Sequence, residues 1–273
     1  AAVERARAAG VSGVLLAGVD APGWRDAALL RARLGDRLDI ALAYGVHPQV
    51  VGELAAPEPA AAPSQLDEQL TALARAARGE PLVAGEPPLP LPQAIGELGL
   101  DGRDLQPASP QRLAPQERAF RAQLALARQL DLPLVLHVVR AHAPVLRILK
   151  GDGVPRRGGV VHSYSGSAEL VADYLRLGLH ISFAGPVTYP EARRVHAAVK
   201  AVPSDRLLVE TDAPDQTPWA RRPAACEPAF LPEVLQALAL HRGQPWQELA
   251  VTTEANARRL FDVNRSSPAS GGT

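Results

Sequence analysis

Continuous apolar runs alternate with longer amphipathic segments along most of the chain. Runs such as "VSGVLLAGV", "PLVLHVV" and the "LLV" that precedes "ETDAP" lack the strict alternation of half-exposed strands, and they are typical of strands covered on both faces of a parallel sheet. We predict seven such strands, starting at Val11, Ile40, Ala94, Pro133, Gly159, His180 and Leu207. Because parallel strands need long crossover connections, the alternation predicts an α/β fold with a parallel sheet.

The segments between the strands have helical periodicity. Predicted helices cover residues 2–9, 24–34, 65–78 and 116–130, end near residues 150, 177 and 201, and cover 232–240 and 246–261. Eight strands close a (β/α)8 barrel of the TIM type. With 273 residues and 47% apolar content, we expect one barrel domain over residues 1–263, with "GEPPLPLP" as a surface loop and residues 264–273 as a disordered tail.

The first strand of such a barrel is not visible in the sequence. The chain has no methionine and opens with "AAVERARAAG", which resembles the middle of an amphipathic helix. We therefore expect an N-terminal piece carrying the first strand to precede it.

Composition narrows the location and the partners. The 29 basic and 29 acidic side chains balance, so nothing predicts a global attraction to nucleic acid or membranes. No apolar run reaches the roughly 18 residues that a membrane helix needs. The single cysteine, Cys226, excludes an internal disulfide and fits a reducing compartment, so we expect a cytoplasmic protein without membrane contact.

Chemically active side chains recur where the predicted strands end. In barrels of this type the active site lies at the carboxyl ends of the strands, so side chains there converge. These residues are His47, Glu97, His137, His162 and Asp212. One such histidine alone is more often a hydrogen-bonded core residue, and Asp212 alone is more often a helix cap. Together, Glu, His, His and Asp on four separate strands instead predict a divalent metal site for Zn²⁺, Mn²⁺ or Mg²⁺.

The motifs around these residues carry a family resemblance. "AIGELGLD", "LHVVRAH", "VVHSYSGS", "ISFAGPVTYP", "RLLVETDAP" and "ANARRLF" occur in the order found in the TatD family of metal-dependent deoxyribonucleases. The similarity spans residues 2–263, and "RAH" and "APD" are most similar to the YjjV-like branch. The resemblance implies a metal-dependent hydrolase on a (β/α)8 barrel, with one or two divalent ions and DNA as substrate.

The resemblance also implies roles for individual residues. Glu97 corresponds to the carboxylate that ligates or bridges the metals, and His137 and His162 correspond to histidine ligands. Asp212 corresponds to the acid beside the attacking water, where it would act as a metal ligand and general base. Glu97 and Asp212 are thus the expected catalytic pair.

Substrate contacts are assigned by position at the strand ends. His47 is expected to contact a phosphate or the leaving group, with a structural histidine as the alternative. Arg140, Arg221 and Arg222 follow strand ends and are expected to bind backbone phosphates, with solvated surface arginines as the alternative. Glu210 lies on the side of its strand that carries Asp212, so we expect it behind the ligands or inside the barrel.

Three features depart from the family pattern. The His-x-His pair that ends the family's first strand is absent from the given sequence. Val138 follows His137 where a polar residue is usual, which predicts weaker support for that ligand. Cys226 occupies a position where relatives often have Asn, and a buried small residue is favoured over a reactive thiol.

Three functions are compatible with these patterns. The leading hypothesis is a nuclease that hydrolyses DNA phosphodiesters. The second keeps the barrel and metals but acts on a small ester, amide or lactone. The third is a degenerate barrel that binds without catalysis, suggested by the absent pair and Val138.

Overall fold

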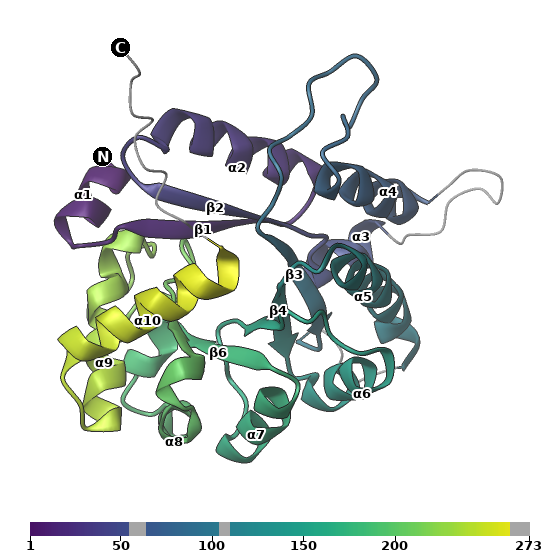
Figure 1. The fold of residues 1–273 in the computed structure, drawn as a ribbon. Coiled ribbons are helices and arrows are strands. Elements are labelled where there is room, and N and C mark those ends of the chain that lie inside the picture. Colours follow the sequence, from purple (N-terminus) through teal and green to yellow (C-terminus); the bar gives the residue numbers. More distant parts are fainter. Residues whose placement is uncertain (55–63, 104–109, 263–273) are drawn as a thin grey trace, which may run out of the picture.

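The computed structural model describes residues 1–54, 64–103 and 110–262. Its centre is one curled sheet of seven parallel strands in sequence order, surrounded by helices (Figure 1). The strands are β1 Gly13–Gly18, β2 Asp39–Tyr44, β3 Ala94–Asp101, β4 Leu134–Val139, β5 Gly159–Val161, β6 Leu179–Phe183 and β7 Leu207–Val209. Each strand pairs in parallel with the next, so all their carboxyl ends lie on one side.

Helices precede, connect and follow the strands. They are α1 Ala2–Ala8, α2 Ala21–Leu34, α3 Pro48–Leu54, α4 Gln65–Ala77, α5 Pro110–Leu130, α6 His142–Asp152, α7 Ala168–Arg176, α8 Arg193–Ala201, α9 Leu231–Arg242 and α10 Trp246–Phe261. Short 3₁₀ turns are η1 Gly185–Thr188, η2 Ser204–Arg206, η3 Trp219–Arg221 and η4 Pro228–Phe230. Of these, η1 and η3 lie in the loops that follow β6 and β7.

The sheet buries apolar side chains on both faces, as the continuous runs predict. The larger cluster lies between strands and helices and includes Trp24, Phe120 and Tyr174, all fully buried. A smaller cluster joins side chains from most of the strands to the end of α10. Its buried members are Ala43, Ala94, Val135, Val160, Leu208, Leu260 and Phe261. These strand residues are the interior of the curled sheet.

The end of α10 closes the interior where the strands begin. Leu260 and Phe261 pack into the inner cluster. Asn256 donates to the carbonyl oxygens of Ser204 and Leu207 at 2.7 and 2.9 Å, at the start of β7. Arg258 pairs with Asp39 at the start of β2 at 3.0 Å. With this end covered, access to the interior is left at the carboxyl ends of the strands.

Two glutamines of α5 hold the carboxyl ends of β2 and β3. Gln123 accepts from the Val46 amide at 2.8 Å and donates to its carbonyl at 3.1 Å. Gln116 accepts from the Asp101 amide at 2.8 Å. Residues seven apart share one helix face, so a single helix fixes both strand ends. The segments carrying His47 and Asp101 are therefore positioned by α5.

The structure confirms the predicted α/β barrel architecture and locates every predicted strand and helix. Strand starts agree to within two residues, and α10 matches its predicted bounds. The loop at residues 85–92 has no helix or strand and is largely exposed. Helix α3 was not predicted, and α5 begins before Pro115 rather than after it. The predicted tail, 264–273, lies outside the described residues, and the eighth strand and the single-domain division stay predictions.

Among the residues that the structure describes, no helix is both long enough and apolar enough to cross a membrane.

Candidate metal centre

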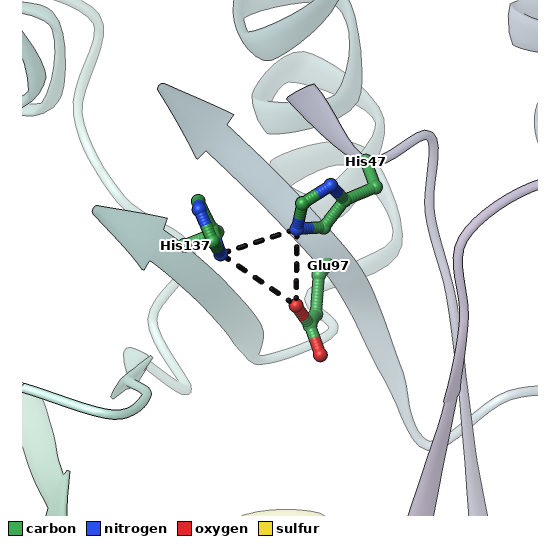
Figure 2. Close-up of side chains that lie close together, drawn as sticks. All are labelled: His47, Glu97 and His137. Atoms are coloured by element: carbon green, nitrogen blue, oxygen red, sulfur yellow. Dashed lines mark hydrogen bonds and ion pairs between the residues drawn. The ribbon is translucent and has the colours of Figure 1, made fainter. Parts of the chain in front are cut away.

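Five side chains from five strand ends meet at the open end of the sheet. Two overlapping groups have ligand atoms within 4.8 Å of one another: His47, Glu97 and His137, and Glu97, His162 and Asp212. Figure 2 shows the first group, with the two imidazoles and the carboxylate directed toward one point. The structure thus brings together all five strand-end residues that the sequence analysis selected, and Glu97 belongs to both groups.

Glu97 reaches this central position through an irregularity in β3. The register between β3 and β4 shifts between Gly96 and Leu98, and such a bulge redirects the side chain it contains. Glycine at residue 45 makes room, because a Cβ there would lie 2.5 Å from the carbonyl carbon of Gly96. One carboxylate oxygen, Oε2, lies 3.2 Å from His162 Nε2, 3.4 Å from His47 Nε2 and 3.8 Å from His137 Nδ1.

His137 is oriented by Asp101. Its Nε2 donates to Asp101 Oδ2 at 3.0 Å, so in the neutral ring Nδ1 has a free lone pair directed into the cluster. Asp101 also accepts from the Arg103 guanidinium at 2.7 Å and from Gln49 Nε2 at 3.2 Å. Burial alone would raise the pKa of Asp101, but hydrogen bonds from His137 and Arg103 outweigh it and hold the pKa well below the usual range. Asp101 therefore remains a carboxylate.

His47 presents an N–H group to the cluster, whereas His137 presents a lone pair. The backbone amide of Gln49 donates to His47 Nδ1 at 3.1 Å, so Nδ1 must be the acceptor. In the neutral ring the proton is then on Nε2, which faces His137 Nδ1 at 3.1 Å. A protonated Nε2 donates a hydrogen bond and does not bind metal. The tautomer makes His47 a hydrogen-bond donor pointing into the site.

His162 lies deepest in the negative part of the cluster. Its Nε2 faces Glu97, and its Nδ1 lies 3.9 Å from Glu210 Oε1. Burial lowers the pKa of His162, but the charges of Glu97, Glu210 and Asp212 raise it to about 10. The pKa of Glu210 is itself raised to about 7, by burial first and then by Asp212 and Glu97. The cluster therefore attracts a positive charge, here a proton on His162.

Asp212 is placed by the loop that follows β7. Its backbone is left-handed, with φ of 56°. Its Oδ2 accepts a hydrogen bond from Gln216 Nε2, and Gln216 Oε1 in turn accepts from Ser163 Oγ at 2.6 Å. The loops after β5 and β7 thus orient the carboxylate jointly.

The donor set fits a divalent cation. Lone pairs of His137 and His162 and carboxylate oxygens of Glu97 and Asp212 converge, and imidazole with carboxylate is the ligand combination suited to Zn²⁺ and Mn²⁺. The three histidines are only 7% exposed each, so water can form few hydrogen bonds with them. His137 Nδ1 lies 3.1 Å from His162 Nε2, so one cation could bind both nitrogens in place of the proton on His162. A cation would satisfy these lone pairs together.

The three arginines predicted to bind phosphates differ in their contacts. Arg140 is exposed at the end of β4. Arg221 pairs with Glu233 at 2.6 Å and lies 5.0 Å from the Phe230 ring centroid. Arg222 lies 5.7 Å from the centroids of Tyr189 and Trp219. Their predicted phosphate contacts stay predictions.

The structure also resolves two departures from the family pattern. Val138 belongs to the core between sheet and helices, so it does not face the cluster. His137 is supported instead by the hydrogen bond that it donates to Asp101, so the expected weakness is not found. Cys226 is buried, and burial raises the pKa of its thiol to about 11, which confirms the buried small residue.

Sequence reasoning missed three residues that position the site. Asp101 was part of a quoted motif but received no role, although it lies four residues from Glu97 on one strand. Gln116 and Gln123 lie in the helix predicted over residues 116–130, and their sequence pattern alone assigns them no role. Their signal was a polar pair seven residues apart in a helix that buries Ala119, Phe120 and Leu124.

Comparison with known proteins connects this geometry to a family. The family model described as "TatD related DNase" matches residues 1–262. The chain is 38% identical over 272 residues to the 3'-5' ssDNA/RNA exonuclease TatD of Klebsiella pneumoniae, covering 96% of this chain and 91% of the relative. It is 39% identical over 171 residues to the uncharacterized metal-dependent hydrolase YabD of Bacillus subtilis, covering 63% of this chain and 66% of YabD.

A solved structure agrees with these sequence matches. The crystal structure of YjjV, a TatD homologue from Escherichia coli K12, superimposes with a TM-score of 0.78 at 30% identity, covering 96% of this chain and 91% of YjjV. These findings confirm the predicted family and, with the His, Glu and Asp cluster, the prediction of a metal-dependent hydrolase. The narrower placement in the YjjV-like branch stays a prediction. The chain belongs to the TatD-related DNase family.

Proposed function

We propose that this protein hydrolyses phosphodiester bonds of DNA at the metal centre formed by Glu97, His137, His162 and Asp212. The observation that carries the proposal is the convergence of Glu97, His162 and Asp212 at the open end of the barrel, with His137 Nδ1 only 3.1 Å from His162 Nε2. The nuclease names of the family and of its Klebsiella relative support DNA as the substrate. The single cysteine supports a cytoplasmic location.

Each residue has a part in this reaction that its contacts support. Divalent ions held by the four ligands would supply a hydroxide near neutral pH and positive charge against the developing oxyanion. Asp212, oriented by Gln216, would take the proton of the attacking water. His47, whose Nε2 carries the proton, would donate to a phosphate oxygen or to the leaving group.

The arginines would contact the nucleic acid outside the centre. Arg140 and Arg222 are exposed past strand ends, where a guanidinium can bind a backbone phosphate. Arg221 is exposed too, but its ion pair with Glu233 must loosen before it can do so.

Degradation of end-labelled oligonucleotides tests the proposal. The protein is loaded with Mg²⁺, Mn²⁺ or Zn²⁺ and compared with the Glu97→Gln variant and an EDTA-treated sample. We expect shortening of the DNA in the loaded wild type only. A metal-loaded protein that leaves single- and double-stranded DNA intact would refute the proposal. Cleavage of 4-nitrophenyl esters without DNA cleavage would favour the small-ester hydrolase, and metal binding without any turnover would favour the non-catalytic barrel.

A further inference from the structure

An aromatic and cationic cluster lies in the loops after β6 and β7, the second of which also carries Asp212. Trp219 is 54% exposed, so its ring is open to a ligand. The Tyr189 ring packs edge-on against it, with centroids 5.8 Å apart. The Arg222 guanidinium lies 5.7 Å from both ring centroids. We call these three residues the aromatic platform.

The platform is fixed to the loops that orient Asp212. The Trp219 amide donates to Thr188 Oγ1 at 2.8 Å, and Tyr189 Oη donates to the Thr217 carbonyl at 2.9 Å. These bonds join the loop after β6 to the loop after β7. The loops meet so closely that a Cβ on Gly185 would lie 1.7 Å from the Gln216 carbonyl oxygen. Trp219 thus follows, by three residues, the glutamine that contacts Asp212, and it is held in place.

The charge of the platform is available to a ligand. Arg221, the neighbouring arginine, is engaged by Glu233. Arg222 forms no ion pair with the residues that the structure describes, and its visible contacts are the two rings. An unpaired guanidinium next to an exposed indole is the combination that binds a base together with its phosphate. In duplex DNA the base faces are already stacked, so such a platform selects unpaired nucleotides.

We propose that Trp219, Tyr189 and Arg222 bind one unpaired nucleotide of the substrate, with its base on the Trp219 ring and its phosphate on Arg222. The inference rests on the proposed function for its substrate, but the platform is a separate site with its own binding energy. The same cluster would also suit a protein partner, since Trp, Tyr and Arg anchor protein interfaces. Its connection to Asp212 favours the nucleotide.

A binding cycle tests the proposal without relying on turnover. Fluorescence anisotropy measures binding of fluorescein-labelled (dT)10 and of a decamer of abasic sites, in EDTA so that no cleavage occurs. In the wild type we expect roughly tenfold tighter binding of (dT)10 than of the abasic strand, since stacking on an aromatic side chain contributes that much or more per base. Trp219→Ala should bind both strands equally, and Trp219→Phe should recover most of the preference.

Trp246 provides a matched control. It is 40% exposed, and it begins α10 shortly after the end of α9. Arg242, at the end of α9, donates to the carbonyl oxygens of Val199 and Val202, which precede β7. Trp246 therefore lies toward the closed end of the barrel. Trp246→Ala should leave the preference unchanged. Arg222→Ala should keep the preference for (dT)10. It should make the slope of log K against log [salt] less steep by about one, because one phosphate contact is lost.

The outcomes separate the platform from the proposed function. A wild type without preference for (dT)10, a preference retained by Trp219→Ala, or no binding of either strand would overturn the platform, and a protein partner would then be the better explanation of the cluster. If the preference holds but metal-loaded protein cuts no DNA, the platform stands and the nuclease proposal fails. If Trp219→Ala instead binds and cuts DNA as the wild type does, the nuclease proposal stands alone.

Discussion

Replacing Asp101 by Asn should weaken metal binding although Asp101 is not itself directed at the metal centre. Its carboxylate accepts from His137 Nε2 at 3.0 Å and thereby leaves His137 Nδ1 as the free lone pair. In Asn the side-chain oxygen can still accept, but a neutral acceptor bonds about half as strongly as a charged one. The amide can also turn its NH₂ toward His137, which would favour the wrong tautomer.

The magnitude follows from the contacts. A hydrogen bond involving a charged group contributes about 1.5–3 kcal/mol, and losing the partner of a metal-bound histidine typically costs about 10–100-fold in affinity. Asp101 has a 5% exposed side chain, so water replaces little of the loss. We expect Asp101→Asn to weaken Zn²⁺ binding about tenfold and Asp101→Ala closer to a hundredfold.

Competition with a chromophoric chelator measures the dissociation constant directly. Asp39→Asn is the matched control, because Asp39 pairs with Arg258 at 3.0 Å at the opposite end of the sheet. The control should bind Zn²⁺ as the wild type does. A folded Asp101→Ala variant whose affinity lies within twofold of the wild type would refute the role assigned to Asp101.

Three further results are expected. The His47→Ala variant should keep its metal, measured by elemental analysis, but lose at least tenfold in kcat on DNA, because His47 donates through Nε2. Loss of metal from this variant would show that His47 is a ligand. Zn²⁺ affinity measured by titration should rise with pH between 7 and 9. The reason is that a proton competes with the metal for His162, whose pKa is raised to about 10. An affinity independent of pH would contradict this. Burial lowers the pKa of His180 to about 4, whereas the histidine of the unfolded chain takes up its proton near pH 6.5. The free energy of unfolding, measured in urea, should therefore fall as the pH falls from 6.5 to 4, and it should fall less steeply in His180→Leu. An equal pH dependence of stability in the two proteins would contradict the assignment.

Much of the fold follows from local pattern. Continuous apolar runs at β3, β4 and β7 predict their strands because both faces of the sheet are covered. Helix α3 was missed since it is short and contains Gly52, a poor helix former, so its periodicity is weak. Helix α5 extends before Pro115, where the usual rule places the boundary.

The site was predictable as a set of strand ends but not as a set of roles. Parallel topology alone brings Glu97, His162 and Asp212 to one side. Which ring nitrogen of His47 or His137 has the lone pair depends on the Gln49 amide and on Asp101, and no sequence spacing encodes that tautomer. The platform was likewise only half visible, since Arg222 follows a strand end but its contact with Tyr189 joins two separate loops.

Elemental analysis of the protein after loading with Zn²⁺ and removal of excess metal tests the metal centre most directly, with His162→Ala and the control His241→Ala measured alongside. His162 lies 3.2 Å from Glu97 in the cluster, whereas His241 stacks on His196, with ring centroids 3.7 Å apart, near the end of α9. We expect near-stoichiometric zinc in the wild type and the control and a large loss in His162→Ala. Folded wild-type protein without zinc, or zinc fully retained in His162→Ala, would contradict the assignment of these strand ends as a metal centre.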